Sequence, residues 1–181
     1  MASQTHVLIE ALVASGTPGA MEIDNIPGTY TDLELVWSFQ YNSYSPTTQA
    51  GHNAIWRIND VTTNTVYPYL RWGVMYGTGD SSTHEDTATS HLVASGFSST
   101  TSDHSACGRM MFFDYANSAA TGKSIQSFHS SMKYSADSYD KALMASSGNL
   151  NLAAAITSIK AYGDSSFKDG SYMRLYGISR S

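Results

Sequence analysis

The sequence predicts an all-β protein, an antiparallel β-sandwich or jelly roll of about ten strands with little helix. Short runs of β-branched and aromatic residues recur at spacings of roughly 8 to 15 residues. Turns rich in Gly, Ser and Asp separate these runs, and the clearest run alternates with a period of two rather than 3.6. The 181 residues lack a linker and fit one domain over residues 1–181.

The clearest strand covers residues 32–41, where Leu33, Leu35, Trp37, Phe39 and Tyr41 alternate with mostly polar residues. This alternation predicts a strand with one buried face. The other predicted strands cover Thr5 to Ala14, Ala20 to Ile26, His52 to Asn59, Val66 to Tyr76, Thr89 to Ala94, Gly108 to Tyr115, Ser124 to Tyr134 and Tyr139 to Ala145.

The last quarter of the chain predicts a hairpin that closes the fold. Its strands are Ala155 to Ile159 and Tyr172 to Ile178, on either side of a Gly/Asp/Ser turn. Met173 and Leu175 share one face of the second strand, while Tyr172, Arg174, Tyr176 and Ile178 share the other. Apolar residues on both faces predict that this strand lies between two layers.

Four segments are expected outside the strands or at their ends. Gly77 to Thr87 and Ser98 to Ser105 are polar and predict exposed loops. Asp137 to Ser147 and Leu150 to Ile156 could form at most one or two short helical turns.

The composition is polar but weakly charged. Charged residues make 14% of the chain, against roughly 25% in soluble domains. Many Ser and Thr residues and 12 Tyr are typical of extracellular β-proteins, including virion surface proteins; an unusual soluble β domain is the alternative. No signal peptide or spanning apolar run is visible, so we expect no membrane partner and release by cell lysis.

Charge and cysteine content exclude further classes. A net charge of −5 without a basic cluster predicts no nucleic-acid partner. The single cysteine, Cys107, excludes an internal disulfide. Its neighbours predict a buried, inert thiol at the start of a strand.

The sequence predicts no catalytic, cofactor or metal site, and no enzyme. The six histidines lack ligand spacing. His84-Glu85-Asp86 could hold a cation, but a solvated loop tip explains these residues equally. Thr121-Gly122-Lys123-Ser124 resembles the end of a phosphate-binding loop, yet Asn117 stands where the first glycine is required. Ser130 and Lys133 have an S-x-x-K spacing without its partner motifs.

Carboxylates and aromatic residues are the remaining candidates. Asp32, Glu34 and Asp114 could supply the facing acids of glycan hydrolysis, but any β-protein with 15 acids offers such pairs. Among the aromatics, Trp37, Trp56 and Trp72 are expected in the core. Tyr41, Tyr44, Tyr67, Tyr69 and Tyr76 cluster at strand ends, where exposed rings could stack on sugars or anchor a protein interface.

The segment Ile26-Pro27-Gly28-Thr29-Tyr30-Thr31-Asp32-Leu33 resembles the I-P-x-T-Y-T-D-L segment of small virion structural proteins of tailed phages, notably cyanophages and other marine phages. The similarity continues at Asp114-Tyr115-Ala116, followed by Lys123, at Ala155 to Ile159, and from Phe167 to Ile178. The middle of the chain, Gly77 to Ser105, does not follow the family pattern closely. We expect this variable segment to determine which partner the protein binds. Tyr30 is expected to hydrogen-bond across the sandwich, and Gly177 to mark a close approach or a bulge.

The resemblance implies a structural protein of the outer virion surface, made in the host cytoplasm. The family contains capsid-decoration and tail-appendage proteins. A compact domain without shaft, heptads or repeats predicts a decoration (cement) protein, a homotrimer that binds the major capsid protein and stabilises the shell by bridging capsomers. The alternative is a tail-fibre or tail-tip adhesin that binds host glycan through its long loops. A depolymerase with a carboxylate pair is a third, more distant option.

Overall fold

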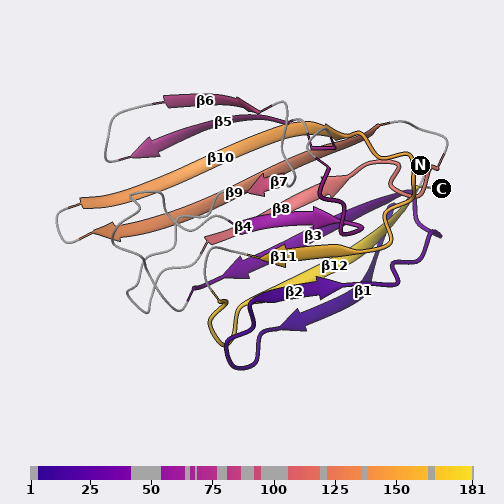
Figure 1. Cartoon of the computed structure of the whole chain (residues 1–181), viewed down its shortest axis with the longest axis horizontal. Helices are drawn as coiled ribbons and strands as arrows, with labels where there is room; N and C mark the ends of the chain where they lie inside the picture. The colour runs from indigo at the N-terminus through magenta and orange to yellow at the C-terminus, as the bar shows by residue number, and fades with distance from the viewer. Residues whose placement is uncertain are drawn as a thin grey trace.

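The computed structural model describes residues 4–41, 54–63, 66–67, 69–76, 81–86, 92–94, 106–118, 122–135, 138–162 and 166–180. These residues form twelve strands and no helix (Figure 1). The strands are β1 (Gln4–Val13), β2 (Ala20–Ile23), β3 (Asp32–Phe39), β4 (Ala54–Ile58), β5 (Tyr69–Tyr76), β6 (Ser81–Asp86), β7 (Leu92–Ala94), β8 (Ala106–Phe112), β9 (Lys123–Ser135), β10 (Ser138–Leu150), β11 (Ile159–Tyr162) and β12 (Tyr172–Arg180).

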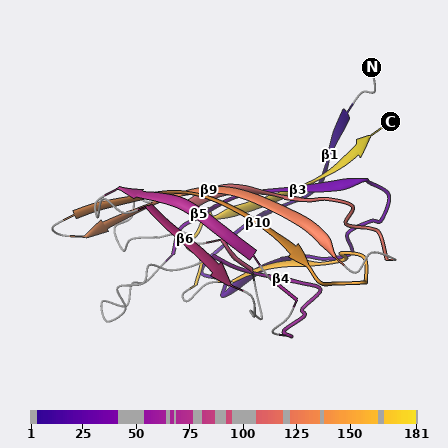
Figure 2. The ribbon, with the colours of Figure 1, turned by 90° about the horizontal axis from the view of Figure 1, so that it is seen from above.

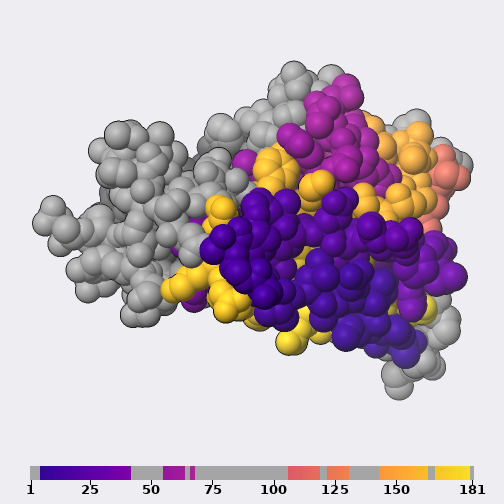
Figure 3. Space-filling model, turned by 60° about the horizontal axis from the view of Figure 1, so that its bottom comes forward, coloured from indigo at the N-terminus to yellow at the C-terminus, as the bar shows by residue number. Residues whose placement is uncertain are grey.

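Two antiparallel sheets confirm the predicted all-β sandwich. The larger sheet has eight strands in the order β1-β12-β3-β8-β9-β10-β5-β6. The smaller sheet has four strands in the order β2-β11-β4-β7. β1 and β12 extend together toward the two termini (Figure 2). The first and last strands are therefore neighbours, and Figure 3 shows the N-terminal residues (indigo) beside the C-terminal ones (yellow).

The predicted closing hairpin is wrong. β11 begins at Ile159, where the predicted strand ends, and pairs with β2 and β4 in the smaller sheet, while β12 lies in the larger one. Residues 155–158 are held outside the ladder, because Ile156 N–H donates to the carbonyl of Tyr115 at 3.0 Å and Thr157 N–H to the side chain of Asn59 at 2.8 Å. The chain therefore crosses from one sheet to the other.

Three further local predictions are corrected. Within the predicted loop Gly77 to Thr87, residues 81–86 form β6, which pairs with β5 from Ser81↔Val74 to Asp86↔Tyr69. β6 is the last strand of the eight-stranded sheet, and charged side chains are common on edge strands because they oppose pairing with another chain. Of the segment Asp137 to Ser147, the described residues 138–147 belong to β10 and form no helical turn, and none forms between Leu150 and Ile156. The predicted loop Ser98 to Ser105 lies outside the described residues.

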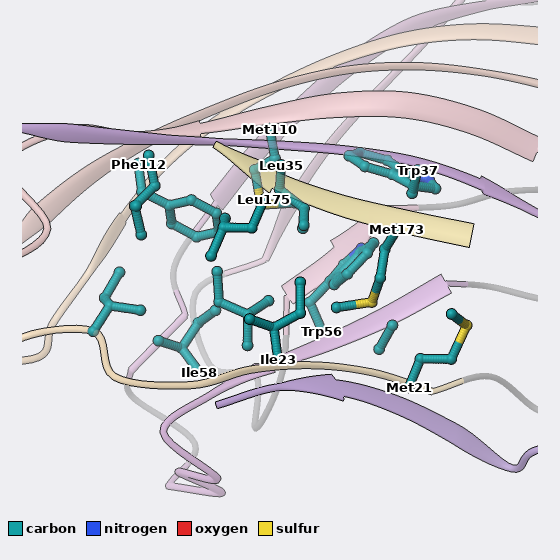
Figure 4. Close-up of a cluster of buried hydrophobic side chains, with 14 of the residues drawn as sticks. Met21, Ile23, Leu35, Trp37, Trp56, Ile58, Met110, Phe112, Met173 and Leu175 are labelled. Atoms are coloured by element: carbon teal, nitrogen blue, oxygen red, sulfur yellow. The ribbon is translucent and has the colours of Figure 1, made fainter. Parts of the chain in front are cut away.

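The core lies between the sheets (Figure 4). The alternation of β3 is confirmed, because Leu33, Leu35, Trp37 and Phe39 are buried. Trp37 meets Trp56 of the opposite sheet edge-on, with ring centroids 5.1 Å apart and planes at 64°. Both tryptophans are core residues, as predicted; the side chain of Trp72 lies outside the described part. The core is completed by Met110, Phe112, Met173 and Leu175 of the larger sheet and by Met21, Ile23 and Ile58 of the smaller one.

β12 is fully covered on one face only, whereas the sequence predicted a strand between two layers. Met173 and Leu175 are buried between the sheets. In the other predicted set Tyr172 and Tyr176 are partly exposed and Arg174 is exposed, and Ile178 near the end of the strand is buried. β12 is thus part of an outer layer and not a middle one.

Four segments that are distant in sequence meet at one end of the sandwich, here called the corner (residues 26–32, 114–117, 155–158 and 177–178). The Tyr115 hydroxyl donates to the carbonyl of Pro27 and accepts from Tyr30 N–H at 3.4 Å. The Asp32 carboxylate accepts from Asp114 N–H at 3.0 Å. The hydrogen bond across the sandwich therefore comes from the side chain of Tyr115 and not, as predicted, from that of Tyr30.

Gly177 marks the predicted close approach. A Cβ built on Gly177 would lie 2.3 Å from the Tyr30 ring, so the ring packs directly on the strand backbone. Nearby, Asn59 joins the turn after β4 to residues 155–158. Its Nδ2 donates to the carbonyl of Ala155 at 2.7 Å, and its Oδ1 accepts from the N–H groups of Thr157 and Ser158 at 2.8 and 3.1 Å.

Gly177→Ala is expected to lower the free energy of unfolding by about 1–3 kcal/mol, because the added methyl displaces the Tyr30 ring. Gly19→Ala is the control, since a Cβ there meets no atom within 4 Å and should change stability by less than about 0.5 kcal/mol. Urea unfolding measures both variants. Equal effects would show that Tyr30 does not pack tightly on Gly177.

Asn59→Ala is expected to cost about 2–3 kcal/mol more than Asn25→Ala, because three backbone groups lose their partner. The two asparagines are matched in backbone conformation, with φ of 53° at Asn59 and 52° at Asn25. The Asn25 side chain donates only to exposed Asp24 among the hydrogen bonds described for it, at 2.6 Å. Similar losses in chemical denaturation would indicate that only the backbone conformation matters.

Candidate functional site

The acidic residues considered for catalysis have structural contacts. Buried Asp32 accepts from Asp114 N–H in the corner. Asp114 in turn accepts from the Asn117 side chain at 2.8 Å. Glu34 lies on the outside of the larger sheet, 3.5 Å from His6 Nε2 and 3.7 Å from an Arg109 nitrogen. These contacts place Asp32 and Asp114 in the framework and Glu34 on a surface.

Lys123, the lysine of the phosphate-loop-like segment, has a structural role. Its side chain is buried, and Nζ donates to the carbonyls of Asn117 and Leu152 at 2.9 and 2.8 Å. Burial lowers the pKa of Lys123, while the charge of nearby Asp114 raises it. Lys123 begins β9 directly, so the segment lacks the helix of a phosphate-binding loop.

No group of three or more His, Cys, Asp or Glu side chains in the described ranges could hold a metal ion. His84, Glu85 and Asp86 belong to β6, and their side chains lie outside the described part. Within those same ranges, no helical segment has the length and hydropathy that crossing a membrane requires.

Two of the five tyrosines predicted at strand ends are not exposed. Tyr41 and Tyr67 are buried, and Tyr67 accepts a hydrogen bond from Ile58 N–H at 3.0 Å. Burial raises the pKa of the Tyr67 hydroxyl, although the hydrogen bond from Ile58 lowers it. Tyr44 lies outside the described residues, as do the side chains of Tyr69 and Tyr76. Partly exposed tyrosines instead lie at Tyr172 and Tyr176 of β12.

The candidate site is the outer sheet face, the face of the eight-stranded sheet that points away from the core. Strand register arranges its residues in rows across six strands. The first row is Val13, Tyr172, Ser38, Cys107, Ser130 and Leu143. The second row is Ala11, Arg174, Val36, Arg109, Phe128 and Ala145. The third row is Leu8, Tyr176, Glu34, Met111, Gln126 and Ser147.

Large apolar side chains are concentrated on the outer sheet face. Val13 and Leu143 are 64% and 65% exposed, and Leu8 and Phe128 are each 52% exposed. These four are among the five large apolar residues that are exposed in the described part of the chain; the fifth is Val7. A soluble protein rarely gathers such residues on one face unless that face binds something.

An open groove of about 460 Å³ crosses this face. Phe128, Leu143 and Tyr172 line it together with the smaller side chains of Cys107 and Ser130. The Cys107 sulfur lies 3.3 Å from the Ser130 hydroxyl and is exposed, so the prediction of a buried thiol is wrong. Its strand alternates from core to surface at each residue, and Cys107 has the outward position beside inward Ala106 and Gly108.

Two arginines carry the positive charge among the described side chains of the outer sheet face. The Arg109 guanidinium lies 5.8 Å from the centre of the Phe128 ring, and Arg174 lies 5.0 Å from that of Tyr172. Arg109 and Arg174 both lie directly opposite Val36, one on each side. Aromatic rings, aliphatic side chains and arginines are the residues enriched in protein contact surfaces. The face is therefore suited to binding.

Cys107 should react with a thiol reagent in the folded protein, to one modified thiol per chain, because its side chain is exposed in the groove. Ellman's reagent without denaturant measures this reaction. Cys107→Ser is the control and should show no reaction and an unchanged melting temperature. Reaction only after denaturation would contradict an open groove.

The sequence matches no protein-family model and no curated protein.

Proposed function

We propose that this chain is a virion structural protein of a tailed phage, a capsid decoration protein that binds the major capsid protein from outside and stabilises the shell. The observation that carries the proposal is the outer sheet face, an extended surface of exposed apolar and arginine side chains. A cement protein acts by burying such a surface across joints between subunits, without catalysis.

The strand order supports a jelly roll, a fold that capsid proteins and lectins share. Strands β1, β12, β3 and β8 are neighbours in one sheet, and β2, β11, β4 and β7 form the other. Along the chain, β1 to β4 alternate between the sheets, and β7, β8, β11 and β12 do so in turn. We propose that β5–β6 and β9–β10 are hairpins added to this jelly roll, since they widen only the larger sheet.

A second candidate is the tail adhesin that binds host glycan. The open groove between Phe128 and Tyr172 favours it, because sugar rings stack on aromatic side chains. We prefer the capsid decoration protein, because the exposed apolar residues extend beyond the groove to Leu8 and Val13 at the sheet edge. A ligand of one or two sugar rings would not cover so wide a surface. A homotrimer at three-fold positions of the shell, which the family resemblance implies, is part of the proposal.

Purified phage particles test the proposal by quantitative mass spectrometry and by immunogold labelling. We expect copy numbers in fixed ratio to the major capsid protein and gold over the head. Particles that lack the protein should lose DNA at a lower temperature, because a ligand that binds only the intact shell stabilises it. Absence from particles, or gold on the tail alone, would overturn the proposal, and tail labelling would support the adhesin.

A further inference from the structure

We propose that the outer sheet face is the surface that binds the shell, and that its partner is an acidic, partly apolar surface of the major capsid protein rather than a second copy of this chain. This inference rests on the proposed function and adds the contact residues and the chemistry of the partner. The homotrimer proposed above then uses other surfaces.

The size of the outer sheet face suits a protein partner. Six strands about 4.8 Å apart and three rows about 6.8 Å apart cover on the order of 600 Å². A specific protein interface buries roughly 800 Å² on each partner. Phe128 lies in the fifth of these strands and Val13 and Leu143 at the two outer ones, so apolar contacts extend over the whole width.

The charge of the outer sheet face identifies an acidic partner. Arg109 and Arg174 flank Val36 in one row, and the Arg109 side chain is 60% exposed. The nearby carboxylate, Glu34, is shared between Arg109 and His6 and is itself only 17% exposed. Among its described side chains, the face therefore presents more positive than negative charge, on a chain whose net charge is −5.

The same charge disfavours a second copy as the occupant. Two outer sheet faces packed against each other would bring the arginine pair of one copy next to that of the other. Like charges brought together in a contact are unfavourable, and they are relieved only by a partner of opposite sign. Carboxylates on a different protein can form charge-assisted hydrogen bonds with both guanidinium groups. Apolar side chains beside them can pack on Phe128 and enter the groove.

Residues outside the outer sheet face offer matched controls. In the smaller sheet, Lys160 lies between Glu22 at 3.0 Å and Asp60 at 3.5 Å, so its charge is balanced. Arg57 lies 4.5 Å from the centre of the Tyr162 ring. This arrangement is similar to that of Arg174 on the outer sheet face, which lies 5.0 Å from the centre of the Tyr172 ring. Val7 is exposed, as Val13 is, but it pairs with Gly177 on the side of the larger sheet that faces the core. Val7 is therefore an exposed valine of the same strand that does not belong to the outer sheet face.

The test measures binding of purified variants to particles from a phage that lacks this gene, by co-sedimentation. Arg109→Gln with Arg174→Gln, and separately Leu143→Ser with Phe128→Ser, should each weaken binding at least about tenfold. The first pair should also reduce the dependence of binding on salt. Arg57→Gln and Val7→Ser should bind within about twofold of wild type. Circular dichroism and melting temperature confirm that each variant folds.

A photo-cross-linking residue at position 143 identifies the occupant on intact particles. We expect a product with the major capsid protein, at a peptide that contains Asp or Glu. A product between two copies of this chain, or with a tail protein, would overturn the inference. Wild type and outer-face variants binding equally well would refute the inference and leave the proposed function standing. Failure of wild type to bind would refute both.

Discussion

The contact between Trp37 of β3 and Trp56 of β4 fixes how the two sheets lie on each other. It depends on Gly108 of the neighbouring strand, because a Cβ there would lie 2.6 Å from the Trp37 ring. In a strand, committing one set of alternating residues to the core leaves the other set outside. The burial of Trp37, Met110 and Met173 therefore determines that Val36, Arg109 and Arg174 point outward.

The corner holds the fold together, whereas the outer sheet face presents side chains to the surroundings. The hydroxyl of Tyr115, the side chain of Asn59 and the ring of Tyr30 join segments that are distant in sequence. Their contacts are internal, so these residues build the framework. The binding that we propose would instead depend on outward residues such as Phe128, Leu143 and Arg174.

The sequence predicted correctly those features that depend on short stretches of the chain. The period of two in β3 placed Trp37 in the core, and an isolated glycine in a strand marked the close approach at Gly177. A hairpin before β12 was predicted wrongly, because contacts of Asn59, nearly 100 residues away in sequence, hold residues 157–158 outside any strand. The outer sheet face was missed because it requires the register of strands distant in sequence. Cys107 meets Ser38 and Ser130 only through that register, and a polar run such as β6 gives no strand signal.

Cryo-electron microscopy of the intact particle tests the central claim most directly, since it shows both the location of the protein and the face in contact. The account predicts two-layered β density on the icosahedral shell. In that density the eight-stranded sheet faces the capsid protein, and Arg109 and Arg174 lie next to acidic side chains. Density confined to the tail, or a four-stranded sheet turned toward the shell with the outer sheet face in solvent, would contradict it.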